Sequence, residues 1–167
     1  MEAFKKSLPA LLTTLYKAAI EKRTKTTDFM GADTWRSFND FLPQSLLKNG
    51  LNKLFILTDG YLDFESNRFV GKNGNRTTDS RMINRLRNLT NWQQVLNSPE
   101  EGIIPVKSSF GNLQVCVAEI HPKNMALQEQ SIIIALWKKW LNEMKIRQST
   151  FIVRGNILEN KVQLASF

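Results

Sequence analysis

Cysteine and histidine are nearly missing from this 167-residue chain, which holds one of each, Cys116 and His121. A single cysteine excludes an internal disulfide and a cysteine-based metal cage, and it mildly favours a reducing compartment. A single histidine leaves too little material for a histidine-based zinc site or a Ser-His-Asp relay. We expect Cys116 to be a small buried core residue, because it lies in an apolar alternating run. We expect His121 to have a surface or capping role.

The chain also lacks a long apolar run. Its longest strongly apolar blocks are residues 54–57 and 132–137, far below the roughly 18 to 20 residues that a membrane-spanning helix needs. The amino-terminal segment does not look like a signal peptide, because its apolar stretch is short and is interrupted by Pro9. We therefore expect no contact with a membrane and a cytoplasmic location.

The overall composition is that of an ordinary globular protein, with 42% hydrophobic and 23% charged residues. A chain of this length fits one compact domain, so we expect a single domain over residues 1–167. Its 23 basic and 15 acidic residues give a net charge of +8. That charge favours contact with nucleic acid, an acidic protein or an anionic surface, and does not choose among them.

Hydrophobic spacing predicts helices over residues 4–20, 80–96 and 124–144, and another that starts at residue 33 or 34 and is kinked or ended near Pro43. The block 53–60 predicts a strand that is apolar on both faces and ends in turn residues, which is typical of a central parallel strand. Two further strands are expected at 113–120 and 150–153, and an exposed loop or hairpin at 61–78.

This alternation of strands and helices predicts an α/β fold, with a Rossmann-like parallel sheet flanked by helices. Three strands are few for so many helices. Either the first strands lie outside these residues, or another chain completes the sheet, or an early segment is a strand that the pattern does not reveal.

Residues 54–61, with the sequence LFILTDGY, resemble the Thr-Asp-Gly end of a central strand in von Willebrand factor type A domains. A similar order of elements extends the likeness over residues 4–153. In that family three loops hold a divalent metal, and Mg²⁺ suits such an oxygen-ligand site. The resemblance implies that Asp59 is the third-loop ligand and that Thr34, in the segment GADTW at 31–35, is the second-loop ligand. The family's first motif, Asp-x-Ser-x-Ser, does not occur in the chain.

Our first hypothesis is a protein-binding domain like those of this family. Asp33, Tyr61 and Asp63 would contact the partner at the loops that follow the strands. A second numbering of this loop, shifted by one position, would put the metal-binding threonine at position 35 and the partner-binding aspartate at position 34.

Each of these assignments has a purely structural alternative. Asp59 and the glycine after it can form a turn in which the carboxylate accepts backbone amides. Thr34 or Asp33 can be an ordinary helix cap.

The alternative hypothesis is nucleic-acid binding by a basic loop and helix. The residues that would carry it are Arg68, Lys72, Arg76, Arg81, Arg85 and Arg87. A third class is an enzyme with an acidic Mg²⁺ site built from Asp59, Asp63 and Glu65. No phosphate-binding glycine motif and no base or nucleophile accompanies those carboxylates, so we expect a binding protein rather than an enzyme.

Overall fold

The computed structural model describes residues 2–21, 33–63, 69–72, 75–124, 127–155 and 157–167. The chain divides into two compact units, Met1–Ala32 and Asp33–Phe167. The expectation of one domain over residues 1–167 stays a prediction. The α/β fold and the site described below belong to the unit Asp33–Phe167.

The first unit contains the helix α1 (Glu2–Glu21), at the place that the apolar spacing predicted. Pro9 lies inside it, although proline lacks the amide hydrogen that a helix interior uses. The hydroxyls of Thr13 and Thr14 donate to the carbonyls of Pro9 and Ala10 at 2.8 and 2.9 Å, the bond to the preceding turn that threonine commonly makes in a helix.

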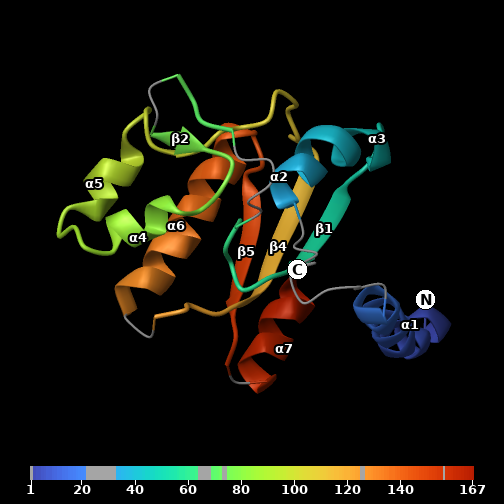
Figure 1. Cartoon of the computed structure of the whole chain (residues 1–167). Coiled ribbons are helices and arrows are strands. Elements are labelled where there is room, and N and C mark those ends of the chain that lie inside the picture. The colour runs from blue at the N-terminus through green and yellow to red at the C-terminus, as the bar shows by residue number, and fades with distance from the viewer. Residues whose placement is uncertain (1, 22–32, 64–68, 73–74, 125–126, 156) are drawn as a thin grey trace. The chain divides into compact units, whose positions relative to one another are not determined.

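The second unit is built on a sheet of three parallel strands in the order β1-β4-β5 (Figure 1). The strands are β1 (Asn52–Leu57), β4 (Leu113–Ile120) and β5 (Gln148–Val153). The helix α6 (Leu127–Glu143) connects β4 to β5. The predicted fold class, a Rossmann-like parallel sheet flanked by helices, is therefore confirmed.

Helices cover the two faces of the sheet unequally. On one face Val115 and Val117 share a core with the buried side of α6, which includes Trp137 and Trp140. The short helices α4 (Met82–Leu86) and α5 (Trp92–Asn97) pack against α6 from outside. On the other face a small cluster around Cys116 lies near α7 (Ile157–Ser166), which contacts β5. Alternation along β4 sends successive side chains to these two clusters.

The segment before β1 is a continuous run of helical turns made of α2 (Thr34–Arg36), the π-helix η1 (Ser37–Phe41) and α3 (Leu42–Ser45). Asp33 is its N-cap, with its carboxylate accepting from the Arg36 amide at 2.9 Å. The run ends at residue 45, near Pro43 as expected. The π-helix η1 ends two residues before this proline, and such bulges are one way in which a helix bends.

Two expectations need correction. The helix expected over residues 80–96 is two helices, α4 and α5, separated by a turn that contains Asn88 and Asn91, and asparagine favours turns over helix interiors. The strand β1 lies at an edge of the described sheet and not at its centre.

In its described part, the exposed loop or hairpin expected over 61–78 has a hairpin contact, the antiparallel bridge of Val70 with Thr77, and Phe69 and Val70 are 56% and 51% exposed. The strand β2 (Arg76–Thr77) also pairs with β3 (Gly102–Ile103).

Cys116 has no exposed surface, and burial raises the pKa of its thiol. The expectation of a core cysteine is confirmed. Within the described residues, no helix combines the length and apolarity needed to cross a membrane.

Candidate functional site

The turn that follows β1 is fixed by hydrogen bonds within itself, to the segment after β4 and to α6. The Asp59 carboxylate accepts from the Tyr61 amide at 3.1 Å, and the Asp59 carbonyl accepts from the His121 amide at 2.9 Å. The indole of Trp137 on α6 donates to the Gly60 carbonyl at 2.8 Å. These bonds tie the carboxyl ends of β1 and β4 to α6, so the residues that follow the turn start from a fixed position.

A pocket of about 350 Å³ opens beside this turn, at the carboxyl end of the strands. We call it the rim pocket. Its lining comes from the segment after β1, the start of α4, the segment after β4 and the first turn of α6. The lining residues are Tyr61, Asp63, Ser80, Arg81, Ile83, Asn84, Arg87, Lys123 and Glu129.

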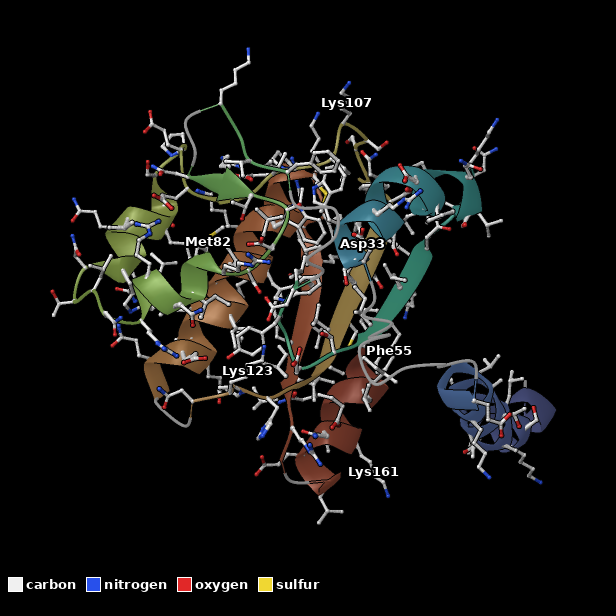
Figure 2. The ribbon with its side chains drawn as sticks, in the orientation of Figure 1. Asp33, Phe55, Met82, Lys107, Lys123 and Lys161 are labelled. Carbon is white, nitrogen blue, oxygen red and sulfur yellow. The ribbon has the colours of Figure 1, made fainter. Side chains whose placement is uncertain are left out.

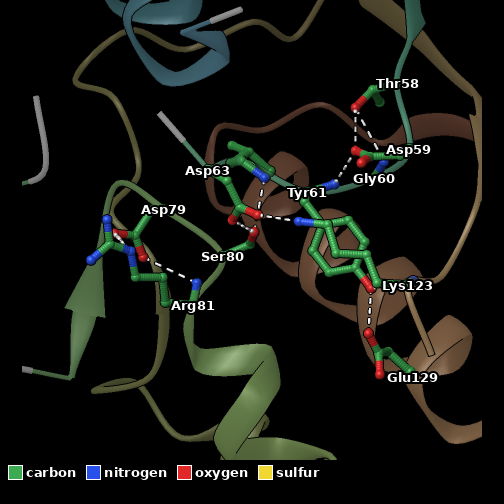
Figure 3. A network of polar contacts seen from close by, with 11 residues as sticks. Thr58, Asp59, Gly60, Tyr61, Asp63, Asp79, Ser80, Arg81, Lys123 and Glu129 are labelled. Carbon is green, nitrogen blue, oxygen red and sulfur yellow. Dashed lines mark hydrogen bonds and ion pairs between the residues drawn. The ribbon is translucent and has the colours of Figure 1, made fainter. Parts of the chain in front are cut away.

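Asp63 joins three of these segments. Its carboxylate accepts from the Ser80 hydroxyl at 2.8 Å and from the Lys123 ammonium at 2.7 Å. The Ser80 hydroxyl oxygen in turn accepts from the Leu62 amide at 2.9 Å. The Lys123 ammonium also lies 4.3 Å from the centre of the Tyr61 ring, a cation–π distance. The mouth of the pocket is therefore held together by charged contacts (Figure 3).

Glu129 forms the floor of the rim pocket and is only 1% exposed. The Tyr61 hydroxyl donates to its carboxylate, and an Arg87 guanidinium nitrogen lies 3.4 Å from it. The Tyr61 hydroxyl oxygen also accepts from the Lys123 amide at 2.9 Å. A buried carboxylate is tolerated when hydrogen bonds and an opposite charge compensate its desolvation, and Glu129 has both.

These contacts lead to a prediction about the ionisation of Tyr61. Burial and, next, the hydrogen bond to Glu129 raise the pKa of Tyr61 to about 12. Because an unfolded tyrosine has a pKa of about 10, this contribution to stability is fully present below pH 10 and is lost as the pH rises to about 12. Tyr16 and Tyr61 are the only tyrosines. A tyrosinate absorbance titration of the wild type and of Tyr61→Phe therefore isolates Tyr61, and a midpoint near 10 would contradict the network.

Tyr61 and Asp63, two residues that the sequence pointed to, come together in the rim pocket. Asp33 is not among its lining residues, because its carboxylate caps α2. Thr34 is the first residue of that helix. Asp59 lies two residues before Tyr61, the first lining residue, and uses its carboxylate in the turn. The structural alternatives for Asp33 and Asp59, a helix cap and a turn, are both present.

The numbering of the second loop that is shifted by one position is wrong. A metal-binding threonine at position 35 and a partner-binding aspartate at position 34 do not exist, because these positions hold Trp35 and Thr34. An indole offers no oxygen ligand to Mg²⁺. Trp35 has a packing role instead, since its indole donates to the Ile104 carbonyl at 2.7 Å and its ring lies 5.8 Å from that of Phe69.

Among the described residues, no group of three or more His, Cys, Asp and Glu side chains could hold a metal ion. The chain also lacks the Asp-x-Ser-x-Ser segment that the family uses for its first metal loop. A Mg²⁺ ion at Asp59 and Thr34 would need further oxygen ligands from elsewhere.

The predicted basic surface is largely paired with acidic side chains. Arg76 forms an ion pair with Glu143 at 2.6 Å, and Arg85 forms one with Glu101 at 2.5 Å. Arg87 lies 3.4 Å from Glu129, and Arg81 lies 3.5 Å from Asp79. Of the other two residues, Lys72 is exposed and Arg68 lies outside the described residues. These ion pairs lower the positive potential that this surface can offer to a phosphate backbone.

Sequence reasoning missed the other half of the rim pocket, which includes Lys123 and Glu129. A usable signal was present, because both residues follow a parallel strand and such segments meet at one edge of a sheet. Hydrophobic periodicity alone gave no reason to pair either residue with Tyr61.

Comparisons with protein-family models, with curated protein sequences and with solved structures found no match to this chain. The resemblance to von Willebrand factor type A domains therefore stays a prediction, carried by residues 54–61 and the order of elements.

Proposed function

We propose that this domain binds a protein partner at the rim pocket and that the partner inserts an acidic side chain there. The observation that carries the proposal is the pocket itself, which four segments build at the carboxyl end of a parallel sheet. Ligands of open α/β sheets gather at that edge, where loops from successive strands converge.

The charges of the rim pocket support an acidic occupant. Three cationic side chains line it, from Arg81, Arg87 and Lys123, and they outnumber the two carboxylates of the lining, Asp63 and Glu129. The carboxylates nearest the two arginines, Asp79 and Glu129, are each only 1% exposed, so an incoming group meets the guanidinium side of each pair. The net charge of +8 would speed the approach of an acidic protein.

A charge reversal at Lys123 tests the proposal. A displayed library of random peptides is selected on the protein, and we expect the enriched peptides to carry Asp or Glu beside apolar residues. The selected peptide should bind Lys123→Glu about tenfold more weakly than the wild type, because one favourable charge contact becomes repulsive. Fluorescence polarisation measures both affinities. Lys123 is an exposed side chain, so the variant is expected to fold.

Lys107→Glu is the matched control, because it makes the same charge change at another exposed lysine. Lys107 and Lys123 are well separated in Figure 2, with Lys107 at the top of the domain and Lys123 far below it. The control should bind the peptide within about twofold of the wild type. Enriched peptides without acidic residues, or equal binding to Lys123→Glu, would refute the proposal.

Mg²⁺ is a secondary part of this proposal, with Asp59 and Thr34 as its ligands on the chain and the partner's carboxylate as another. The same polarisation assay with Mg²⁺ and with a chelator separates the two modes of binding. If Mg²⁺ participates, the chelator and Asp59→Asn weaken binding to a similar extent.

Nucleic-acid binding is the alternative function, and the exposed Lys72 is the described residue that favours it. This alternative requires affinity for a single-stranded or duplex oligonucleotide that falls steeply with salt and weakens in Lys72→Ala. The ion pairs of the four described arginines are the reason that we place it second.

A further inference from the structure

The outer edge of β1 has the features of a strand that pairs with another strand. The amides of Asn52 and Thr58 donate to β4, to the carbonyls of Asn112 and Ala118 at 2.9 and 3.0 Å. In a parallel strand, alternate residues direct both of their backbone groups to the same neighbour. The residues between, Lys53, Phe55 and Leu57, therefore direct their amides and carbonyls away from β4, and within the described residues no strand pairs with that edge.

Two of the three outward-facing residues of this edge carry apolar side chains that are unusually open. Phe55 is 44% exposed and Leu57 is 48% exposed. Edge strands are normally protected from pairing by charge, proline or a bulge, and the last two of these are absent from β1. Apart from the charge of Lys53, β1 therefore lacks the protection that an edge strand exposed to water usually has.

We propose that this edge pairs with a second copy of the same chain, β1 against β1 in antiparallel orientation, about a two-fold axis at Phe55. In this register Phe55 is opposite Phe55 of the partner subunit, and Lys53 is opposite Leu57 of the partner subunit. Each of the three outward-facing residues then forms both of its backbone hydrogen bonds with the residue opposite it in the other copy. A shifted register would leave at least one of the three without such a partner. The two sheets of three strands become one continuous sheet.

Charge complementarity is the reason for a second copy rather than an unrelated strand. Lys53 lies at the start of β1, where its ammonium donates to the Phe167 carbonyl of the same chain and lies 5.2 Å from the centre of the Phe167 ring. The exposed Asp59 follows the end of the strand. The antiparallel two-fold places Lys53 on the diagonal from Asp59 of the partner subunit, within reach of a long side chain. Because the same contact forms twice, the strand is complementary to itself.

The net charge of +8 on each copy opposes this association. The repulsion between the two positively charged copies acts over longer distances than the Lys53–Asp59 contacts. Salt screens charges that are more than about 8 Å apart at physiological ionic strength, so it weakens this repulsion more than it weakens the contacts. A short strand pair also buries less surface than most stable interfaces. We therefore expect a dimer with a dissociation constant of about 10 μM, strengthened rather than weakened by added salt.

Disulfide trapping tests the register. In Phe55→Cys the two new thiols lie across the axis, at the separation of about 5.5 Å between Cα atoms that a directly opposed pair has and that a disulfide accepts. Leu57→Cys is the matched control, because its thiols would lie about 13 Å apart, four residues of offset. The buried Cys116 does not interfere. Under mild oxidation we expect covalent dimers from Phe55→Cys at least about tenfold faster than from Leu57→Cys.

Sedimentation velocity of the full chain gives the second readout. We expect a concentration-dependent dimer that Phe55→Lys abolishes, because it places two charges at the axis. Both cysteine variants and Phe55→Lys alter exposed side chains, so we expect them to fold, and a melting curve of each variant checks this. A wild type that stays monomeric above about 200 μM, or equal trapping in both cysteine variants, would overturn the proposal. So would an edge that pairs only with a different polypeptide. Failure of these tests leaves the rim pocket untouched, since none of its residues is changed.

Discussion

Replacing Gly60 by alanine is expected to lower the free energy of unfolding by about 3 kcal/mol. Gly60 has a φ of 102°, a conformation that costs a side-chain-bearing residue about 1 to 2 kcal/mol. An added Cβ would also meet the Ile133 side chain of α6 at 2.6 Å and that of Ile120 at 3.3 Å. Ile133 is fully buried in the core, so relieving this contact requires α6 to move, at about 1 to 3 kcal/mol.

Two other glycines separate the causes of this loss. Gly111→Ala adds a methyl group into open space without a left-handed backbone and should cost less than about 0.5 kcal/mol. Gly50 has a φ of 151° and open space around it, so Gly50→Ala reports backbone strain alone. Chemical denaturation of the three variants should give the order Gly111, Gly50, Gly60 in increasing loss. A Gly60→Ala variant as stable as Gly111→Ala would show that α6 does not press on this turn.

The same contact connects stability to the proposed site. Gly60 separates the turn at Asp59 from Tyr61, and its carbonyl accepts from the indole of Trp137. A shift of α6 would also carry Glu129, the floor of the rim pocket, away from the Tyr61 hydroxyl. We therefore expect Gly60→Ala to disturb the ionisation of Tyr61 as well as the stability of the fold.

The sequence predicted those features that depend on neighbours along the chain. The strands β1, β4 and β5 and the helix α6 follow from apolar runs of the right length and period. The cap at Asp33 and the turn at Asp59 follow from the preference of short polar side chains for nearby backbone amides. These elements alone define the fold class.

The features that the sequence did not predict depend on contacts between distant residues. Tyr61 and Glu129 are 68 residues apart in the chain, and no periodic pattern couples them. The arginines looked like one basic surface because their carboxylate partners lie elsewhere in the sequence, as Glu143 does for Arg76. The edge position of β1 was missed for a related reason, since its apolar pattern is that of a central strand.

The second large effect is expected at Arg76, which the sequence placed in a nucleic-acid surface. We expect Arg76→Ala to lower the free energy of unfolding by about 3 kcal/mol. Its guanidinium donates to the Pro99 and Ile103 carbonyls at 2.7 and 2.9 Å and to both carboxylate oxygens of Glu143 at 2.9 and 2.6 Å. The hydrogen bonds to Glu143 raise the pKa of Arg76. Alanine removes all four bonds and leaves a carboxylate that is only 27% exposed without this partner.

A double-mutant cycle with Glu143→Gln identifies the source of that loss. If the bidentate pair carries much of it, the two substitutions together should cost about 1 to 3 kcal/mol less than the sum of their separate effects. Lys72→Ala is the control from the same predicted surface, and its exposed side chain predicts a change below about 0.5 kcal/mol. Unchanged stability in Arg76→Ala, together with weaker binding to an oligonucleotide, would contradict this account. Removing a residue that holds β2 against α6 must lower the stability of the fold. Unchanged stability would therefore indicate that Arg76 belongs to a nucleic-acid-binding surface instead.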